Sequence, residues 1–171
     1  MLESNKLKEK LSQCNPVLGT WNTLASPLVT EVFAQAGLDF QIIDLEHGPF
    51  ILDQVHLHVS ACENSNNCTP LVRIPENSEW MALQALDQGA HGVVVPHIDS
   101  VDSARRLVNA TKYYPEGDRG FTPFSKAGGF TNKNISSYVR RAVSESINIV
   151  IIESSDGLGN LDEILSVDNI D

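Results

Sequence analysis

Short apolar runs with almost no polar alternation recur along the chain between longer amphipathic stretches. A strand with one wet face alternates apolar and polar residues, whereas a strand covered on both faces is apolar throughout. The repeated pattern therefore predicts a parallel sheet wrapped by helices, which is an α/β fold. The apolar runs lie at residues 16–21, Phe40–Asp44, 70–73, 92–96 and 147–152.

The stretches between these runs predict helices, and Gly37 and Gly89 follow two of them, as a C-terminal glycine commonly does. Residues 113–134 differ, because they are rich in Gly and Pro and too long for an ordinary connection. We expect a functional loop there, which hides one further strand. The predicted helices cover residues 1–13, 27–36, 51–62, 78–88, 100–111, 135–144 and 159–166.

Repeated strand–helix units with polar residues at the strand ends predict a (β/α)8 TIM barrel, whose active site collects at the carboxyl ends of the strands. About six such units are recognisable, whereas a closed barrel typically takes about 250 residues. We therefore expect residues 1–171 to form one partial barrel domain. The C-terminal strands and helices would be missing, and residues 167–171 would lead toward a further strand.

The composition narrows the possible partners. A formal net charge of −10 and a pI near 4.8 argue against nucleic acid or an anionic membrane, because both would repel the chain. No apolar stretch approaches the roughly 20 residues that cross a bilayer, and residues 1–13 lack the apolar centre of a signal peptide. These features predict a cytoplasmic enzyme that acts on a small molecule.

The six residues at 44–49, Asp-Leu-Glu-His-Gly-Pro, mark the candidate active-site edge. Asp44, Glu46 and His47 stand where a buried apolar run stops at Gly-Pro. Carboxylates and an imidazole are costly to bury without partners, whereas a site that moves protons or holds a metal needs them there. His47 is therefore a candidate for proton transfer, with a carboxylate beside it to orient the ring.

Other predicted strands also end in polar or aromatic residues. Trp21, Arg73 and Glu153 would converge with the 44–49 block in a barrel, and together they suit enolate chemistry. Arg73 has the alternative of a plain surface ion pair. Glu153 ends the most apolar run, which favours a metal or another cation as its partner. The remaining histidines are interpreted as structural or solvated: His56, His58, His91 and His97.

The long loop contains two cations, Arg119 and Lys126, which are available to meet an anionic substrate. Their alternative is solvation at the surface.

Several short motifs in order along the chain resemble the HpcH/HpaI aldolase family. Together they cover essentially the whole chain. They are Gly-Thr-Trp at 19–21, the 44–49 block, Val-Arg at 72–73, Val-Val-Pro at 94–96, Tyr-Tyr-Pro-Glu-Gly-Asp-Arg-Gly at 113–120 and Ile-Ile-Glu at 151–153.

The resemblance implies a TIM barrel of the phosphoenolpyruvate/pyruvate type and a class II aldolase reaction. A 4-hydroxy-2-oxo acid would be cleaved to pyruvate and an aldehyde with the help of Mg²⁺, Mn²⁺ or Co²⁺. By matching position, His47 would act in proton transfer and Asp44 would orient it. Arg73 would bind the keto oxygen and stabilise the enolate. Glu153 would be a metal ligand, and Trp21 would line the pocket near the aldehyde portion.

Two departures from the family pattern affect these expectations. Ile151 stands where members commonly carry Gln, which puts the substrate preference in question. The second metal-binding carboxylate of the family belongs to a Gly-Pro-x-Asp-Leu segment that this chain does not contain. One carboxylate would hold Mg²⁺ weakly, so we expect little catalysis from these residues alone.

Two alternatives remain open. One is a non-catalytic remnant that only associates with other subunits, since family members form homo-oligomers. The other is a citramalyl-type lyase that acts on acyl thioesters.

Overall fold

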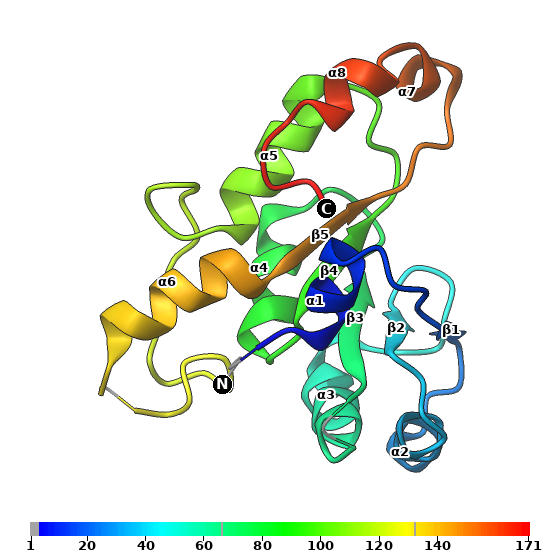
Figure 1. Ribbon diagram of the computed structural model, residues 1–171, viewed down its shortest axis with the longest axis vertical. Helices are drawn as coiled ribbons and strands as arrows, with labels where there is room; N and C mark the ends of the chain where they lie inside the picture. Colours follow the sequence, from blue (N-terminus) through cyan, green and yellow to red (C-terminus); the bar gives the residue numbers. More distant parts are fainter. Residues whose placement is uncertain (1–3, 66, 132) are drawn as a thin grey trace.

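Within residues 4–65, 67–131 and 133–171, which the computed structural model describes, five strands form one parallel sheet (Figure 1). Their spatial order follows the chain, and helices separate them in sequence. The predicted α/β fold with a parallel sheet is therefore confirmed. The strands are β1 Gly19–Asn22, β2 Phe40–Asp44, β3 Thr69–Arg73, β4 Gly92–Val95 and β5 Ile147–Val150.

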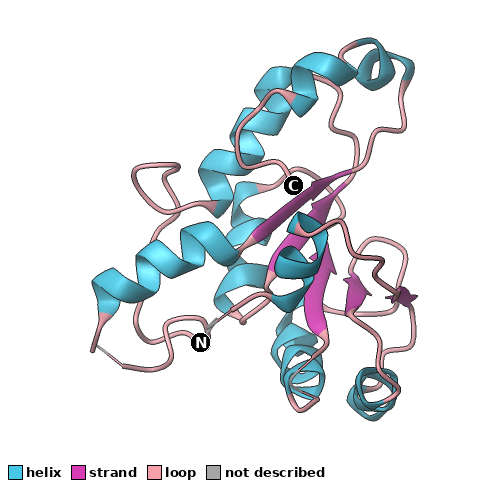
Figure 2. Ribbon diagram, in the orientation of Figure 1, coloured by secondary structure: helices cyan, strands magenta, loops and turns pink. Residues whose placement is uncertain are grey.

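Helices surround the strands, as the cyan and magenta ribbons of Figure 2 show. Local sequence sets several of their ends. Pro27 opens its helix, Ser78 and Ser100 accept hydrogen bonds from backbone amides in the first turns, and Gly37 and Gly89 follow helix ends with positive φ. The helices are α1 Lys6–Ser12, α2 Pro27–Gln35, α3 Val55–Glu63, α4 Glu79–Asp87, α5 Val101–Thr111, α6 Ile135–Glu145, α7 Ser155–Gly159 and α8 Leu161–Leu165, with a 3₁₀ turn, η1, at Leu52–Gln54.

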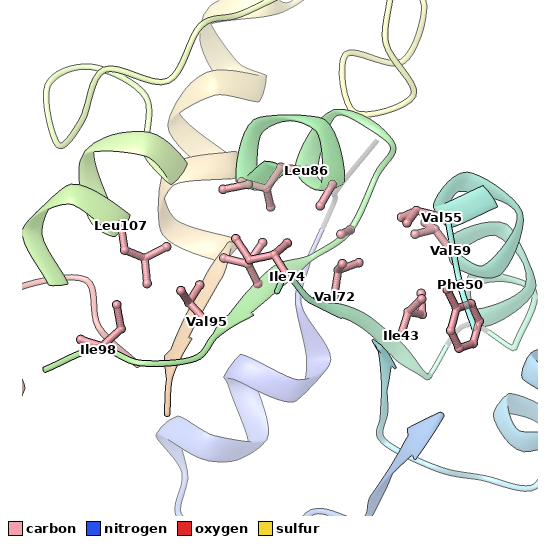
Figure 3. Packing of buried hydrophobic residues seen from close by; sticks show 14 of the residues in the cluster. Ile43, Phe50, Val55, Val59, Val72, Ile74, Leu86, Val95, Ile98 and Leu107 are labelled. Carbon is pink, nitrogen blue, oxygen red and sulfur yellow. The ribbon is translucent and has the colours of Figure 1, made fainter. Parts of the chain in front are cut away.

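The main hydrophobic core lies between one face of the sheet and the helices α3, α4 and α5 (Figure 3). Ile43, Val72 and Val95 point from the strands into this core, and Leu86 and Leu107 meet them from the helices. Each such side chain contributes about 1.5–3 kcal/mol when it is fully buried. This core fixes the positions of the strands, and through them the positions of the residues at the strand ends.

The opposite face of the sheet carries a second apolar cluster. Ile42, Leu71, Val94 and Ile147 lie together there, and Leu7 of α1 packs on them. Alternate residues of one strand thus serve opposite faces, as the pleat requires. In a barrel, the face that α1 covers is the interior.

The long connection between α5 and α6 contains no strand in residues 113–131 or 133–134, and residue 132 lies outside the described part. The prediction of a hidden strand there is wrong. The segment is built from turns, and its polar side chains tie it to helix ends rather than to a neighbouring strand. The described chain therefore shows five strands where about six units were expected.

The last residues run back beside β5. The amide of Asp171 donates to the carbonyl of Asn148, and the amide of Asn148 donates to the Asp171 carboxylate, both at 2.9 Å. Of the expected N-terminal helix, residues 1–3 lie outside the described part and α1 begins at Lys6. None of the described helices has the length and apolar character needed to cross a bilayer.

Candidate functional site

The candidate site lies at the carboxyl edge of the sheet, on the face that carries the second apolar cluster. Residues two apart along a strand share a face. Asp44 therefore lies on the same face as Ile42, and Arg73 lies on the same face as Leu71. Trp21 is the register partner of Ile42 on the neighbouring strand. The alternation of side chains along the strands therefore places three predicted site residues, Trp21, Asp44 and Arg73, on one face of the sheet.

Asp44 and Arg73 form the centre of this edge. Nε of Arg73 donates to Oδ1 of Asp44 at 2.7 Å, and Nη2 donates to Oδ2 at 2.5 Å. The Asp44 side chain is only 1% exposed and that of Arg73 is 13% exposed. Burial acts to raise the pKa of Asp44, but hydrogen bonds from Arg73 and from the amides of His47 and Glu46 outweigh it and lower the pKa. Asp44 is therefore a firmly ionised carboxylate.

A tight turn after β2 presents the next side chains. Oδ1 of Asp44 accepts the amide N–H groups of Glu46 at 3.0 Å and His47 at 3.2 Å. A Cβ on Gly48 would stand 2.4 Å from the carbonyl oxygen of Asp44, so only glycine fits at this closest approach. The sequence of the 44–49 block thus determines the turn as well as the chemistry.

Glu46, rather than Asp44, is the carboxylate beside the His47 ring. Nε2 of His47 lies 3.8 Å from Oε1 of Glu46, while Oε2 of Glu46 lies 2.9 Å from Nη1 of Arg73. The expectation that Asp44 orients the imidazole differs from this geometry, because the Asp44 oxygens are taken up by Arg73, Trp21 and two backbone amides. The His47 side chain is 75% exposed and so is accessible to a ligand.

Trp21 forms the wall beside the ion pair. Its indole Nε1 donates to Oδ2 of Asp44 at 3.1 Å, and the Arg73 guanidinium lies over its ring at 4.7 Å from the centroid. Stacking on an aromatic face adds a cation–π attraction and holds the guanidinium plane in place. Trp21 is 44% exposed, so its ring is accessible to a ligand.

Glu153 and His97 meet at the neighbouring strand ends. The backbone N–H of His97 donates to Oε1 of Glu153 at 2.9 Å, and Nδ1 of the same histidine lies 3.2 Å from that oxygen. Glu153 contributes to raising the pKa of Arg73, after the larger contributions of Asp44 and Glu46, so it lies near the guanidinium. His97 was interpreted as structural or solvated. The only sequence signal for a role was its place after Pro96 at a strand end.

The described residues do not complete a metal site. They contain no group of three or more His, Cys, Asp or Glu side chains arranged to hold an ion. Glu153 offers one carboxylate, whereas both oxygens of Asp44 already accept hydrogen bonds. A divalent ion therefore fits this edge only in part, and its other ligands would be substrate oxygens or further residues.

Arg119 and Lys126 lie at the other end of the sheet. Nη2 of Arg119 is 2.7 Å from Oδ1 of Asp87, the last residue of α4, and Nζ of Lys126 is 2.6 Å from Oε2 of Glu63, the last residue of α3. Each of these helices leads from its end into the amino end of the next strand.

The Arg119 side chain is only 3% exposed, and its guanidinium stacks on the Tyr113 ring at 4.6 Å. Arg119 was predicted to bind substrate, but in this structure the loop folds toward the amino edge of the sheet, where Arg119 pairs with Asp87 and lies away from Arg73. Both loop cations hold the loop onto helix ends. The alternative of surface solvation does not describe Arg119 either.

Two of the remaining histidines contact structural partners, and of these His58 is buried and His91 is half-buried. Nδ1 of His58 lies 2.7 Å from the Thr30 hydroxyl, and its ring packs edge-on against Phe50. His91 lies 3.6 Å from Glu63 at the amino edge of the sheet. His56 is exposed on α3. The structural interpretation of His58 and His91 agrees with these contacts.

Comparison with known proteins gives a consistent result. Residues 18–171 match the family HpcH/HpaI aldolase/citrate lyase. A "hydroxypyruvate/pyruvate aldolase" of Roseovarius nubinhibens is 35% identical over 169 residues, which are 98% of this chain and 65% of the relative. This chain thus spans less than two thirds of that relative's length.

Solved structures also superpose on the chain. A HpcH/HpaI aldolase/citrate lyase family protein from Burkholderia cenocepacia superposes with a TM-score of 0.91 at 30% identity, covering 98% of this chain and 67% of that one. The citrate synthase SbnG superposes with a TM-score of 0.85 at 28% identity, covering 96% of this chain and 62% of that one.

Proposed function

The chain belongs to the HpcH/HpaI aldolase/citrate lyase family, and on that premise we propose that it forms the substrate-binding edge of a divalent-metal-dependent aldolase. The reaction is the reversible cleavage of a 4-hydroxy-2-oxo acid to pyruvate and an aldehyde. The C4 hydroxyl loses its proton as the bond between C3 and C4 breaks, the electron pair passes into the pyruvate enolate, and the enolate takes up a proton at C3 to give pyruvate. The name of the Roseovarius nubinhibens relative, a hydroxypyruvate/pyruvate aldolase, supports pyruvate as one product.

The observation that carries this proposal is the way the Arg73 guanidinium is held. Three of its nitrogens face the carboxylates of Asp44 and Glu46, and the Trp21 ring covers its plane. A guanidinium has five N–H donors, so one N–H on each of Nη1 and Nη2 remains for a substrate oxygen. A fixed donor pair aimed at developing negative charge stabilises an enolate without reorganising during the reaction.

His47 supplies the proton-transfer group in this proposal. Its ring is open to a ligand, and its Nε2 lies 3.8 Å from Oε1 of Glu46. Because Glu46 also faces Arg73, a single carboxylate links the enolate-stabilising cation to the proton-transfer imidazole. His47 would take the C4 hydroxyl proton directly or through a water molecule.

The metal part of the proposal depends on Glu153. A divalent ion would supply Lewis-acid polarisation of the 2-oxo group when bound. The described residues provide Glu153 as one carboxylate ligand, and they do not complete the set. We therefore expect weak metal binding and little turnover by these residues alone.

One observation favours a second candidate, a lyase or synthase of related mechanism that acts on an acyl thioester or a tricarboxylate. The superposition of this chain on the citrate synthase SbnG supports this candidate. The same Arg73 edge would then stabilise the enolate of the acyl thioester. Substrate tests separate the two candidates.

The proposal includes self-association into a homo-oligomer, because a stripe of large apolar side chains on and before α2 is exposed. Its members are Leu24, Leu28 and Val32. Sedimentation velocity checks this directly.

The test of function is pyruvate release coupled to lactate dehydrogenase. A chimera in which the remaining third of the Roseovarius nubinhibens relative follows residue 171 supplies the part of the family fold that this chain does not span. We expect Mg²⁺- or Mn²⁺-dependent release that His47→Ala and chelation abolish, and a folded chimera without activity would favour the non-catalytic remnant. Activity that is undiminished by either treatment would remove the roles assigned here.

A further inference from the structure

Four buried polar side chains lie behind the candidate site, between β1 and β2 on one side and the helices α2 and α3 on the other. They are Asn22, Thr30, Gln41 and His58, and none of the four is more than 1% exposed. Consecutive residues of a strand point to opposite faces, so Asn22 faces the helices while Trp21 faces the site. Polar groups are costly to bury unless each finds a partner. The reaction proposed above gives these side chains no direct task.

Asn22 is the junction of this group. Its Nδ2 donates to the hydroxyl of Thr30 at 3.0 Å and to Oε1 of Gln41 at 3.2 Å, and its Oδ1 accepts the amide N–H of Leu24 at 3.0 Å. A side-chain amide has two donor hydrogens and one acceptor oxygen, so both polar atoms of Asn22 are paired. Nε2 of Gln41 in turn donates to the carbonyl of Thr30 at 2.8 Å. Asn22 thus connects the last residue of β1 to β2, to α2 and to the turn that follows β1.

The polar contacts continue from Thr30 toward the turn after β2. Oγ1 of Thr30 lies 2.7 Å from Nδ1 of His58, and the His58 ring packs edge-on against Phe50 with 4.7 Å between the ring centroids. Phe50 directly follows the 44–49 block, and its ring lies beside α3 in the main core (Figure 3). The same group therefore supports both β1 and the turn after β2.

The position of Trp21 makes this anchoring important. Its ring is 44% exposed, and β1 is a strand of four residues at one edge of the described sheet, where it pairs with β2 (Figure 1). The end of such a strand frays unless side-chain contacts fix it. We propose that Asn22 is a positioning residue, which holds the end of β1 so that the Trp21 indole stays on Asp44 and over Arg73. The inference rests on the proposed function, because its catalytic consequence concerns the Arg73 edge.

A loosened β1 would disturb the site in two ways. The Trp21 ring lies over the Arg73 guanidinium at 4.7 Å, and its Nε1 donates to Asp44 at 3.1 Å, so both the wall and the cation lose a support when the ring moves. Binding and catalytic groups need to be held within about 0.5 Å of their working geometry by the packing and hydrogen bonds behind them. Asn22 provides such a support from the core side. Leucine at this position would fill the space but make none of the three side-chain hydrogen bonds.

Acrylamide quenching of Trp21 fluorescence in the full chain tests the inference without any catalysis. Trp80→Phe, at an exposed residue of α4, leaves Trp21 as the one tryptophan, since the chain contains two. In that background Asn22→Leu is compared with Asn148→Leu, which removes another asparagine that is 1% exposed, in β5. Both variants remove a buried amide from the same sheet, but only Asn22 lies next to Trp21. Urea titration reports the stability of each variant.

We expect the quenching constant of Trp21 to rise in Asn22→Leu, at most about twofold, because the ring moves from 44% exposed toward full exposure. Asn148→Leu should lower stability and leave the quenching constant unchanged. Thr30→Val keeps the side-chain volume but removes one acceptor of Asn22, so it should raise the constant by less. It decides the test if Asn22→Leu does not fold. Quenching that stays at the parent value in every folded variant, or that rises equally in Asn148→Leu, overturns the inference.

Pyruvate release by the chimera separates this inference from the proposed function. Asn22→Leu should lower kcat/KM about tenfold, because a misplaced guanidinium loses part of the enolate stabilisation, and Asn148→Leu should retain the parent value. An active chimera whose kcat/KM is unchanged by Asn22→Leu overturns the inference and leaves the proposed function standing. A raised quenching constant with an inactive parent chimera supports the positioning of Trp21 and counts against the proposed function.

Discussion

Asp44 and Arg73 are register partners on β2 and β3, and their side chains meet in a two-point ion pair at the carboxyl edge of the sheet. The pair joins two neighbouring strands and also orients the guanidinium. This pairing explains how two charged residues, Asp44 and Arg73, can stand at the ends of the apolar strands β2 and β3. The two charges neutralise each other. Asp44, and to a lesser extent the nearby carboxylate of Glu46, raise the pKa of Arg73 and keep it protonated.

Asp44→Asn should destabilise the fold by about 3 kcal/mol, because it leaves the half-enclosed Arg73 without its charged partner. The free energy of unfolding from urea titration measures this. Asp53→Asn, at an exposed carboxylate in η1, serves as the control and should change stability little. An Asp44 variant as stable as the control would show that the pair contributes nothing to the fold.

Arg73→Lys should lower pyruvate release by the chimera about a hundredfold, because Lys cannot make the two-point contact with Asp44 and also keep paired donors for the substrate. Thermal unfolding of the same variant separates a lost donor from a lost fold. Equal activity of Arg73→Lys and parent would count against the guanidinium as the enolate-stabilising group.

The lowered pKa of Glu63 predicts that the fold loses stability in acid. Burial acts to raise its pKa, but His91 and Lys126 outweigh that effect and hold the pKa at about 2, below its ordinary value of 4.5. Because the folded pKa is the lower one, this stabilisation is complete above pH 4.5 and is lost as the pH falls toward 2.

Lys126→Met should reduce the loss between pH 4.5 and 2 and should cost roughly 1 kcal/mol at pH 7. Urea titrations at several pH values measure both effects. Lys133→Met, at an exposed lysine of the same loop, is the control. If the Lys126 variant loses as much stability as the parent between pH 4.5 and 2, Lys126 does not lower the pKa of Glu63.

The buried ammonium of Lys112 predicts a gain of stability in base. Its ammonium is fully buried and donates to the carbonyl of Val143 and to the carbonyl and hydroxyl of Ser146, at the end of α6. Burial, together with Lys8, lowers the pKa of Lys112 to about 8 from its ordinary 10.5. Between these values the unfolded chain binds the extra proton, so the contribution of Lys112 makes stability rise with pH.

Lys112→Met should therefore remove a rise in unfolding free energy between pH 8 and 10 that the parent shows. It should also lower stability at pH 7, because three acceptors lose their donor. Lys6→Met, which removes an exposed donor, provides the comparison. If the unfolding free energies of the Lys112 variant and the parent change with pH in the same way, the buried ammonium is not the source of the rise.

The sequence predicted those parts of the fold that follow from local patterns. β2 was expected with its observed bounds, because its apolar run stops at a tight turn whose residues are determined locally. Trp21, Asp44 and Arg73 were expected to converge, since parallel strands end at one edge. These predictions needed only periodicity and the geometry of a parallel sheet.

The remainder depended on how distant segments meet. No local pattern shows that the 113–134 loop turns toward the amino edge, so the pairing of Arg119 with Asp87 could not be foreseen. The choice of Glu46 over Asp44 as the neighbour of His47 follows from the turn geometry, which the residue types alone do not specify. The positive φ of His97, +55°, is likewise not specified by its residue type.

The exchange of pyruvate methyl protons with D₂O tests whether Arg73 stabilises the enolate, because enolisation needs neither the aldehyde nor its identity. Nuclear magnetic resonance follows the exchange with Mg²⁺ present, in the chimera and in its Arg73→Ala and Arg106→Ala variants, Arg106 being an exposed arginine on α5. We expect exchange that falls at least about a hundredfold in Arg73→Ala and is retained in Arg106→Ala. Exchange that is equally fast in all three proteins would contradict it.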